Sequence, residues 1–315
     1  MKAYLSGALP RTERLIKAYR DFAKNKISQR DLLDEVGKVS RQYIEIQEKN
    51  RLTYIIDGMI TWDDPLRPFA SSLRNVEIDG ISRWFDNNFF YKKPVITGEI
   101  SLKNDIDESI FFHNLIDQRK RKIVLPEPYS FARLSENRFY KRFDDLVLDV
   151  ADALAKFVNR LGSFAQIQLT SPSLVYTKAT EDDFEKSKTA VETVKRKTRG
   201  EIFLHLPFGS AENKLQYLLE FDVEILGIDM YRTPVEVLSK LDTDKSLYLG
   251  LINGRNTVLE NPGDILKMID RVKKIAAVKE IHVGPSCELD YLPSDYALRK
   301  IELIGEILKS VGSNG

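Results

Sequence analysis

The sequence has a single cysteine, Cys287, among its 315 residues. One cysteine excludes an internal disulfide and a zinc site made of several thiolates, and it suits a reducing compartment. No apolar run approaches the ~20 residues that a membrane-spanning helix needs. The first residues, MKAYLSGALPRTERL, also lack the apolar core of a signal peptide. We therefore expect a cytoplasmic protein that does not insert into a membrane.

An excess of charge of either sign is also absent. Lys and Arg number 48 against 47 Asp and Glu, in a chain that is 30% charged and 43% apolar. With such a balance the molecule as a whole has no strong electrostatic field, so we expect no nucleic-acid partner and no attraction to membrane surfaces. Any site for an anion must therefore be a local cluster of basic side chains.

Short apolar runs recur along the chain and predict eight strands. The runs are nearly continuous in apolar residues, as expected for strands buried on both faces of a parallel sheet. They are AYLSG (3–7), TYIIDG (53–58), KIVLP (122–126), FAQIQLTSP (164–172), EIFLHLPF (201–208), EILGIDM (224–230), LYLGLING (247–254) and EIHVGPSC (280–287).

Helical patterns lie between these runs, so the sequence predicts eight units in which a strand is followed by a helix. This predicts an α/β fold, a single (β/α)8 TIM barrel over residues 1–315, with Ser294 as the N-cap of the last helix. The segment after the second strand, approximately residues 62–120, is too long for a simple crossover and is expected to be an insertion at the top of the barrel. A doubly wound sheet is the alternative, but the sequence has no glycine-rich dinucleotide turn to support it.

In such barrels the functional site lies in the loops that follow the strands. His205, Asp229 and Cys287 stand at three of these strand ends and carry the imidazole, carboxylate and thiolate groups that bind zinc. Each also has a structural interpretation. Cysteine is often buried as an inert residue, His205 lies in an apolar run, and Asp229 has Arg232 close by in sequence. The residues alone leave a zinc site and a metal-free core as open alternatives.

Five segments in order along the chain resemble the cobalamin-independent methionine synthases, and within that family their N-terminal barrel. The first resembles the Gly-x-Pro-Arg turn and basic helix that begin that domain, and the last resembles its Pro-Ser-Cys strand end. The segments are GALPRTERLIKAYRDFAKNKISQRDL (7–32), RWFDNNFFYKKP (83–94), GIDMYRTPVEVL (227–238), LGLINGRNTV (249–258) and PSCELDYLPSD (285–295).

The resemblance implies a family of two-barrel enzymes whose C-terminal barrel holds zinc through a His-x-Cys pair, a Glu and a later Cys. That zinc activates the homocysteine thiolate for methyl transfer from methyltetrahydrofolate. This chain departs from the catalytic pattern, because Pro207 stands where the cysteine after His205 would be and Asp229 replaces the Glu. LTSPS (169–173) replaces the acidic motif that holds the amino group of homocysteine. The resemblance therefore implies no firm cofactor, an incomplete zinc set, and a core role for Cys287.

The resemblance also implies contacts with the polyglutamate tail of a folate, whose carboxylates Arg and Lys bind by charge-assisted hydrogen bonds. For Arg14 and Lys17 a solvated basic helix face is the alternative. In the segment 83–94 we expect the large rings of Trp84, Phe85 and Phe89 to pack against the barrel. The candidate contacts with the folate tail or another anion are Arg11, Arg14, Lys17, Arg83, Asn88 and Tyr91.

The function that the resemblance implies is a part in methionine biosynthesis. A free-standing N-terminal-type barrel would bind methyltetrahydrofolate or a related pterin, and a separate zinc-bearing C-terminal-type barrel would transfer the methyl group to homocysteine. We expect such a subunit not to catalyse the reaction alone. Two alternatives stay open, namely an autonomous zinc-dependent homocysteine S-methyltransferase with a degenerate site at His205, Asp229 and Cys287, and a non-catalytic pseudoenzyme.

Overall fold

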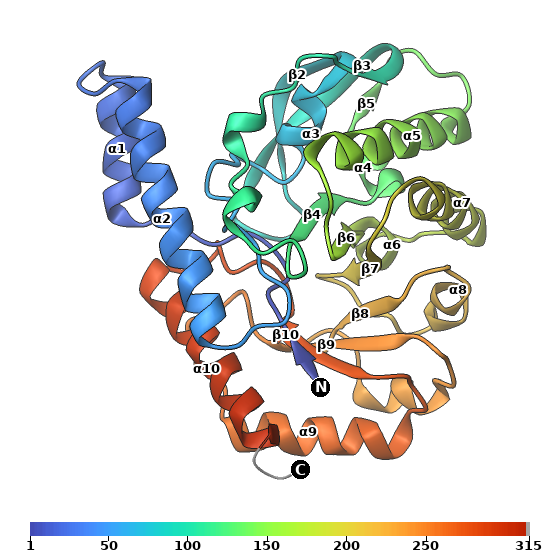
Figure 1. The fold of residues 1–315 in the computed structure, drawn as a ribbon. Helices are drawn as coiled ribbons and strands as arrows, with labels where there is room; N and C mark the ends of the chain where they lie inside the picture. Colours follow the sequence, from blue (N-terminus) through green and yellow to red (C-terminus); the bar gives the residue numbers. More distant parts are fainter. Residues whose placement is uncertain (313–315) are drawn as a thin grey trace.

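A curled sheet of seven parallel strands forms the centre of the computed structural model, which describes residues 1–312 (Figure 1). Its order is β1-β10-β9-β8-β7-β6-β4, which advances without the reversal of a doubly wound sheet. The strands are β1 (Lys2–Ala3), β4 (Lys122–Pro126), β6 (Gln166–Thr170), β7 (Glu201–Leu206), β8 (Ile225–Asp229), β9 (Ser246–Ile252) and β10 (Ile281–Pro285). The fold is therefore an α/β half-barrel, and seven of the predicted strands are confirmed.

The remaining predicted strand, residues 53–58, is not a strand of this sheet. The segment nevertheless lies between the two edge strands. The backbone N–H of Thr53 donates to the carbonyl of Ala3 at 2.9 Å, and that of Ile55 donates to the carbonyl of Lys120 at 2.8 Å. It thus spans the seam between β1 and β4 with isolated hydrogen bonds in place of a ladder.

Two features explain why this segment forms no ladder. Its neighbour β1 is only two residues long, so few backbone groups are aligned for pairing. Gly58 and Met59 then adopt left-handed backbone conformations, with φ of 91° and 52°, which turn the chain away from an extended path. The apolar pattern alone does not reveal either feature.

Six long helices lie between or after the strands, as the helical patterns between the apolar runs predict. Side-chain caps set several starts: Ser28 and Asp31 form a reciprocal capping box, as do Thr180 and Asp183. Ser294 differs from its prediction, because it is the first residue of the last helix and not the cap before it. The helices are α1 (Glu13–Ala23), α2 (Gln29–Lys49), α5 (Phe143–Leu161), α7 (Glu181–Lys197), α9 (Pro262–Ile275) and α10 (Ser294–Gly312), with the shorter α4 (Pro128–Leu134), α6 (Pro172–Tyr176), α8 (Leu215–Leu219) and η3 (Val235–Lys240).

Residues 62–120 form a substructure outside the large sheet. β2 and β3 pair as an antiparallel hairpin, and β3 also pairs in parallel with β5 (Glu136–Asn137), which makes a second sheet of three strands (Figure 1). The elements of this segment are α3 (Arg67–Ser71), β2 (Leu73–Arg83), β3 (Phe90–Leu102), η1 (Glu108–Ile110) and η2 (His113–Leu115).

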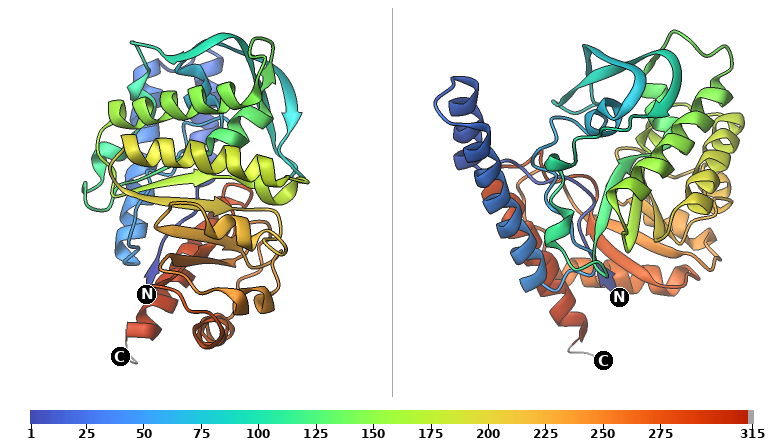
Figure 2. Two further views of the ribbon diagram at one scale, coloured as in Figure 1. Left: turned by 90° about the vertical axis from the view of Figure 1, so that its right-hand side faces the viewer. Right: turned by 45° about the horizontal axis from the view of Figure 1, so that its top comes forward.

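Helices α1 and α2 form a pair beside α10 at one edge of the molecule (Figure 2). The amphipathic α2 turns Val36, Val39 and Tyr43 into the core and leaves charged residues outside. Over residues 1–312, none of the helices combines the length and the apolar character that crossing a bilayer requires.

Candidate functional site

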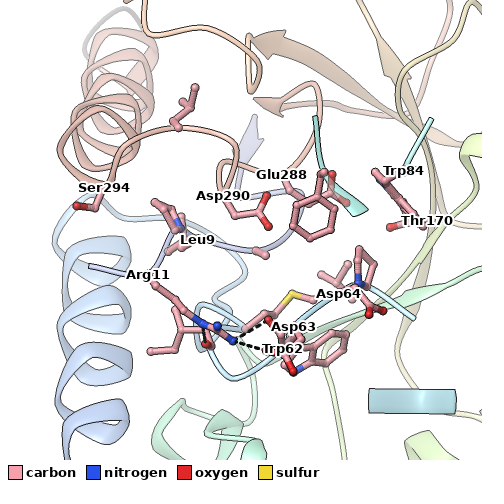
Figure 3. A pocket seen from close by; sticks show the side chains of 18 of the residues that line it. Leu9, Arg11, Trp62, Asp63, Asp64, Trp84, Thr170, Glu288, Asp290 and Ser294 are labelled. Atoms are coloured by element: carbon pink, nitrogen blue, oxygen red, sulfur yellow. Dashed lines mark hydrogen bonds and ion pairs between the residues drawn. The ribbon is translucent and has the colours of Figure 1, made fainter. Parts of the chain in front are cut away.

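A cavity of about 400 Å³ opens at the carboxyl ends of the parallel strands. We call it the strand-end cavity. Its walls come from the loops after β1 and β10, the stretch that follows residues 53–58, the ends of β4 and β6, and the turn of the β2–β3 hairpin (Figure 3). Residues that define it are Leu9, Arg11, Trp62, Trp84, Glu288 and Asp290. This is the edge at which parallel α/β proteins place their functional groups.

Arg11 lines this cavity, and its guanidinium group is held by hydrogen bonds, an ion pair and a ring contact. Its guanidinium donates to the carbonyls of Ile60 and Trp62 at 2.8 and 3.2 Å, and it forms an ion pair with Asp63 at 3.0 Å. It also stacks over the ring of Tyr19, 4.4 Å from the ring centroid. Arg11 therefore fastens the first loop to the stretch after residues 53–58.

Arg14 and Lys17 lie on α1, away from the strand-end cavity. They line a shallow groove between α1 and α2, where Arg14 pairs with Glu35 at 2.6 Å and Lys17 pairs with Asp21 at 2.8 Å. The hydrogen bond to Glu35 raises the pKa of Arg14 further. The structure thus brings Arg14 and Lys17 together but separates them from Arg11.

The candidates in the hairpin have three different environments. Arg83 is exposed and donates to the backbone carbonyl of Asn87 at 2.9 Å. Asn88 is exposed in the turn. Tyr91 is buried and donates to the carbonyl of Leu134 at 3.0 Å, and burial raises its pKa. Arg83 and Asn88 are accessible to a ligand, whereas Tyr91 holds the hairpin onto α4.

The aromatic residues of the hairpin turn pack over the strand ends. Trp84 is buried and meets Phe85 edge to face, with ring centroids 5.1 Å apart. Phe85 contacts Phe208 after β7, and Phe89 contacts Tyr291 after β10. The turn therefore covers the cavity, and Trp84 and Phe89 also line it.

His205, Asp229 and Cys287 are buried, and none of them lines the strand-end cavity. Burial lowers the pKa of His205 to about 3 and raises that of Cys287 well above its usual value. The Asp229 carboxylate accepts hydrogen bonds from the backbone N–H groups of Tyr231 and Phe208 at 2.9 and 3.1 Å. Burial raises its pKa to about 6.

Zinc needs at least three converging donors at about 2.0–2.3 Å, and the donors at this end of the sheet do not meet that requirement. Within residues 1–312 no group of three or more His, Cys, Asp and Glu side chains could hold a metal ion.

Thr170 and Ser171 belong to a buried polar network. Ser171 donates to the Glu127 carboxylate at 2.9 Å, and Ser187 donates to the same carboxylate at 2.9 Å. Glu127 also caps α4 through the backbone N–H groups of its first turn. This network fixes α4, α6 and α7 to one another, and Thr170 alone of these residues lines the cavity.

Glu288 and Asp290 are cavity residues that the sequence analysis did not single out. Glu288 Oε2 and Asp290 Oδ1 are buried and accept no hydrogen bond. Burial raises the pKa of Glu288 to about 7 and, with the neighbouring Glu288 charge, raises that of Asp290 to about 8. The available signal was their position, because Glu288 directly follows Cys287 at a strand end and Asp290 lies two residues further on.

The fold and the strand-end cavity together define a protein of the parallel α/β half-barrel class with its site at the carboxyl ends of the strands. Residues 70–277 match the family described as "Cobalamin-independent synthase, N-terminal domain". This match covers more than half of the chain, so the protein belongs to the cobalamin-independent methionine synthase family, as its sequence motifs predict.

Individual relatives agree with this assignment. The chain is 24% identical over 313 residues to methionine synthase of Saccharolobus solfataricus, an alignment that covers 97% of this chain and 93% of that protein. It is also 24% identical over 306 residues to methionine synthase of Sulfolobus acidocaldarius, covering 94% of this chain and 87% of that protein.

Solved structures show the same fold. A B12-independent methionine synthase from Shewanella sp. W3-18-1 in complex with selenomethionine superposes with a TM-score of 0.76 at 14% identity, over 99% of this chain and 98% of that one. A putative vitamin-B12 independent methionine synthase from Listeria monocytogenes gives a TM-score of 0.77 at 16% identity, with the same coverage. At such identities the likeness concerns the fold.

Proposed function

We propose that this protein takes part in methionine biosynthesis as the N-terminal-type partner of a separate zinc-bearing barrel. That pair would transfer a methyl group from methyltetrahydrofolate, or a related pterin, to homocysteine. The observation that carries the proposal is the match of residues 70–277 to the N-terminal domain of the family. The comparable length of relatives named methionine synthase supports a role for single-barrel chains in this reaction.

The division of labour follows from the chemistry. In the proposed reaction the sulfur of homocysteine attacks the methyl carbon, the bond from that carbon to N5 of the pterin breaks, and N5 keeps the electron pair and takes a proton. A neutral thiol is a poor nucleophile, so the sulfur needs activation. His205, Asp229 and Cys287 do not provide a three-ligand zinc set, so activation falls to the partner.

The contribution of this chain would be to bind the anionic tail of the methyl donor. The Arg14 and Lys17 side chains are 68% and 78% exposed, and their partners are surface carboxylates. Exposed ion pairs stabilise a protein by only about 0.2–1 kcal/mol, so the carboxylates of a polyglutamate tail can replace Glu35 and Asp21 at little cost. Exposed Arg83 and Asn88 would extend this contact toward the hairpin.

We also propose that residues 1–315 act as one (β/α)8 unit in the cytoplasm, with residues 53–58 as its irregular eighth strand and residues 62–120 as an insertion after it. The hydrogen bonds of Thr53 and Ile55 to the flanks of β1 and β4 support the closure. The contact of α2 with α10, from opposite ends of the sequence, supports a single unit.

Reconstitution tests the partnership. The purified protein is mixed with the zinc-bearing barrel from the same genome, methyltetrahydrofolate triglutamate and homocysteine, and methionine is measured. We expect the pair to turn over at least about ten times faster than the zinc barrel alone, a difference of about 1.4 kcal/mol in the barrier. An equal rate without this chain would refute the partnership.

The tail contact has its own test. The variant Arg14→Ala/Lys17→Ala should remove the preference for the triglutamate over the monoglutamate donor. The variant Lys267→Ala/Arg271→Ala is a matched control, because it also removes two exposed, ion-paired cations, but from α9. The tail contact is wrong if both variants bind the two donors as the unchanged protein does, and added salt should weaken the preference.

A further inference from the structure

The strand-end cavity carries an excess of acid. Arg11 is the one cation among its lining residues, whereas four carboxylates belong to the lining. Asp63 and Asp64 are neutralised by ion pairs with Arg11 and Arg67, at 3.0 and 2.9 Å respectively. Among the side chains that the structure describes, none forms an ion pair with Glu288 or Asp290. The loop after β10 therefore brings two acidic side chains without a cationic partner to the cavity.

Glu288 is built into the wall and is not a surface acid. Its side chain is only 4% exposed, and Oε2 accepts no hydrogen bond. The side chain lies directly over Gly7, where a methyl group would come within 2.4 Å of Glu288 Cγ. Leu289 N–H donates to the carbonyl of Ala8 at 3.0 Å, which fastens the loop carrying Glu288 to the loop after β1. A glycine thus makes room for a buried carboxylate that lacks a partner.

A buried carboxylate oxygen without a hydrogen-bond partner is costly, and here two such oxygens belong to side chains two residues apart. Figure 3 shows Glu288 and Asp290 at one part of the cavity and the pair of Arg11 and Asp63 at another. Arg11 is held by three acceptors from the stretch after residues 53–58, so it is not free to neutralise Glu288. A positively charged ligand would supply the missing partner.

The remaining walls suit a flat apolar body. Leu9, Ile60 and Phe89 line the cavity together with Trp62 and Trp84, and these are the two tryptophans of the chain. Aromatic walls bind flat rings well and attract cations through their electron-rich faces.

We propose that the strand-end cavity binds a small organic cation, in which a flat apolar body lies between the aromatic walls and a nitrogen-rich group donates hydrogen bonds to Glu288 and Asp290. The charge of this ligand is opposite to that of the tail proposed for Arg14 and Lys17, and the two sites are separate. The inference rests on the cavity alone and stands or falls independently of the methionine synthase proposal.

Three isosteric probes test the inference. Benzamidine, benzamide and benzoate share one ring and one planar head group, but their heads are positive, neutral and negative. Because both tryptophans line the cavity, tryptophan fluorescence of the intact protein reports binding directly. We expect benzamidine to bind at least about ten-fold more tightly than benzamide, since hydrogen bonds to charged groups are roughly twice as strong as neutral ones. Benzoate should bind most weakly.

The variants Glu288→Gln and Asp290→Asn keep the side-chain shapes and remove the charges. Each should reduce benzamidine affinity about ten-fold and leave benzamide affinity unchanged. Glu302→Gln, an exposed acid on α10, is the control and should change neither. Equal affinity for the three probes, tightest binding of benzoate, or no fluorescence response to any probe would each overturn the inference. Thermal melting curves establish whether each variant is folded. If Glu288→Gln does not fold, the benzamidine affinity of Asp290→Asn provides the test.

Discussion

Asp86, in the turn of the β2–β3 hairpin, forms an ion pair with Arg255, in the loop after β9, at 3.1 Å. The same carboxylate also pairs with Arg232 after β8 at 3.1 Å. One side chain of the hairpin therefore bridges two loops at the strand ends, directly beside the aromatic turn that covers the cavity. Asp86 is 35% exposed, so solvent weakens both pairs.

We predict that Asp86→Asn loosens the hairpin turn with little effect on overall stability. The free energy of unfolding should fall by about 1 kcal/mol or less, because both pairs are partly exposed. Acrylamide should quench Trp84 fluorescence more strongly in the variant, since the turn would open more often. Asp264→Asn, which breaks one surface pair on α9, is the control. Unchanged quenching in Asp86→Asn would mean that aromatic packing alone holds the turn.

Gly7→Ala should destabilise the protein through Glu288. The added methyl group would lie 2.4 Å from Glu288 Cγ, so the carboxylate must move. We expect the free energy of unfolding to fall by about 1–3 kcal/mol, as for other overpacked sites. In a double-mutant cycle by urea denaturation, Gly7→Ala should cost clearly less in a Glu288→Ala background. An equal cost in both backgrounds would show that Glu288 is not the residue that is displaced.

Stability should fall as pH rises from about 6 to 8. The pKa of Glu288 is raised to about 7 and that of Asp290 to about 8, from 4.5 and 3.8. Between the ordinary and the raised pKa values the folded state binds more protons than the unfolded state, so raising the pH favours unfolding. We expect a loss of about 1–3 kcal/mol in urea unfolding across this range.

The variant Glu288→Gln/Asp290→Asn should flatten that pH dependence. Asp229, with a pKa raised to about 6, titrates at the lower end of the range and remains in both proteins. A residual slope near pH 6 is therefore expected, and an undiminished slope near pH 8 would contradict the assignment to Glu288 and Asp290.

Cys287 should be inert in the folded protein. It is fully buried, and burial raises its pKa well above the usual value, so little reactive thiolate forms. With a disulfide reagent we expect its labelling to be slower by on the order of 100-fold in the native protein than in urea. As the chain has one cysteine, the signal is unambiguous.

The same residue separates the open alternatives for metal binding. After incubation with zinc and gel filtration, we expect no stoichiometric metal, and Cys287→Ser should behave like the unchanged protein. Zinc bound one to one, and lost in Cys287→Ser, would revive the autonomous zinc methyltransferase.

Local patterns predicted much of the fold. Apolar runs located the parallel strands within a few residues because strands buried on both faces leave no polar interruption. The α2 helix lies between the first two apolar runs, where a helical pattern was predicted, and Ser28 and Asp31 cap its start reciprocally. The seam at residues 53–58 escaped prediction because the shortness of its neighbour β1 depends on the course of the distant chain.

The site was less predictable because it depends on which charges meet. Arg14 and Lys17 are basic residues in the sequence, but Glu35 and Asp21 neutralise them in the structure. Glu288 looks like an ordinary acid beside Cys287. Its significance comes from Gly7 beneath it and from the absence of a cationic partner among the described residues, and both are properties of the assembled fold.

The seam between β1 and β4 has a mechanical consequence for the cavity. Where neighbouring strands share full ladders, many hydrogen bonds must break together, whereas residues 53–58 are held by isolated ones. Local opening begins where the fewest bonds must break. We therefore expect the cavity wall to open first along residues 53–58, and the cavity to widen there because Leu9 and Ile60, which follow β1 and residues 53–58, line it. Ligand entry would then depend on the opening of residues 53–58 and not only on movement of the β2–β3 hairpin.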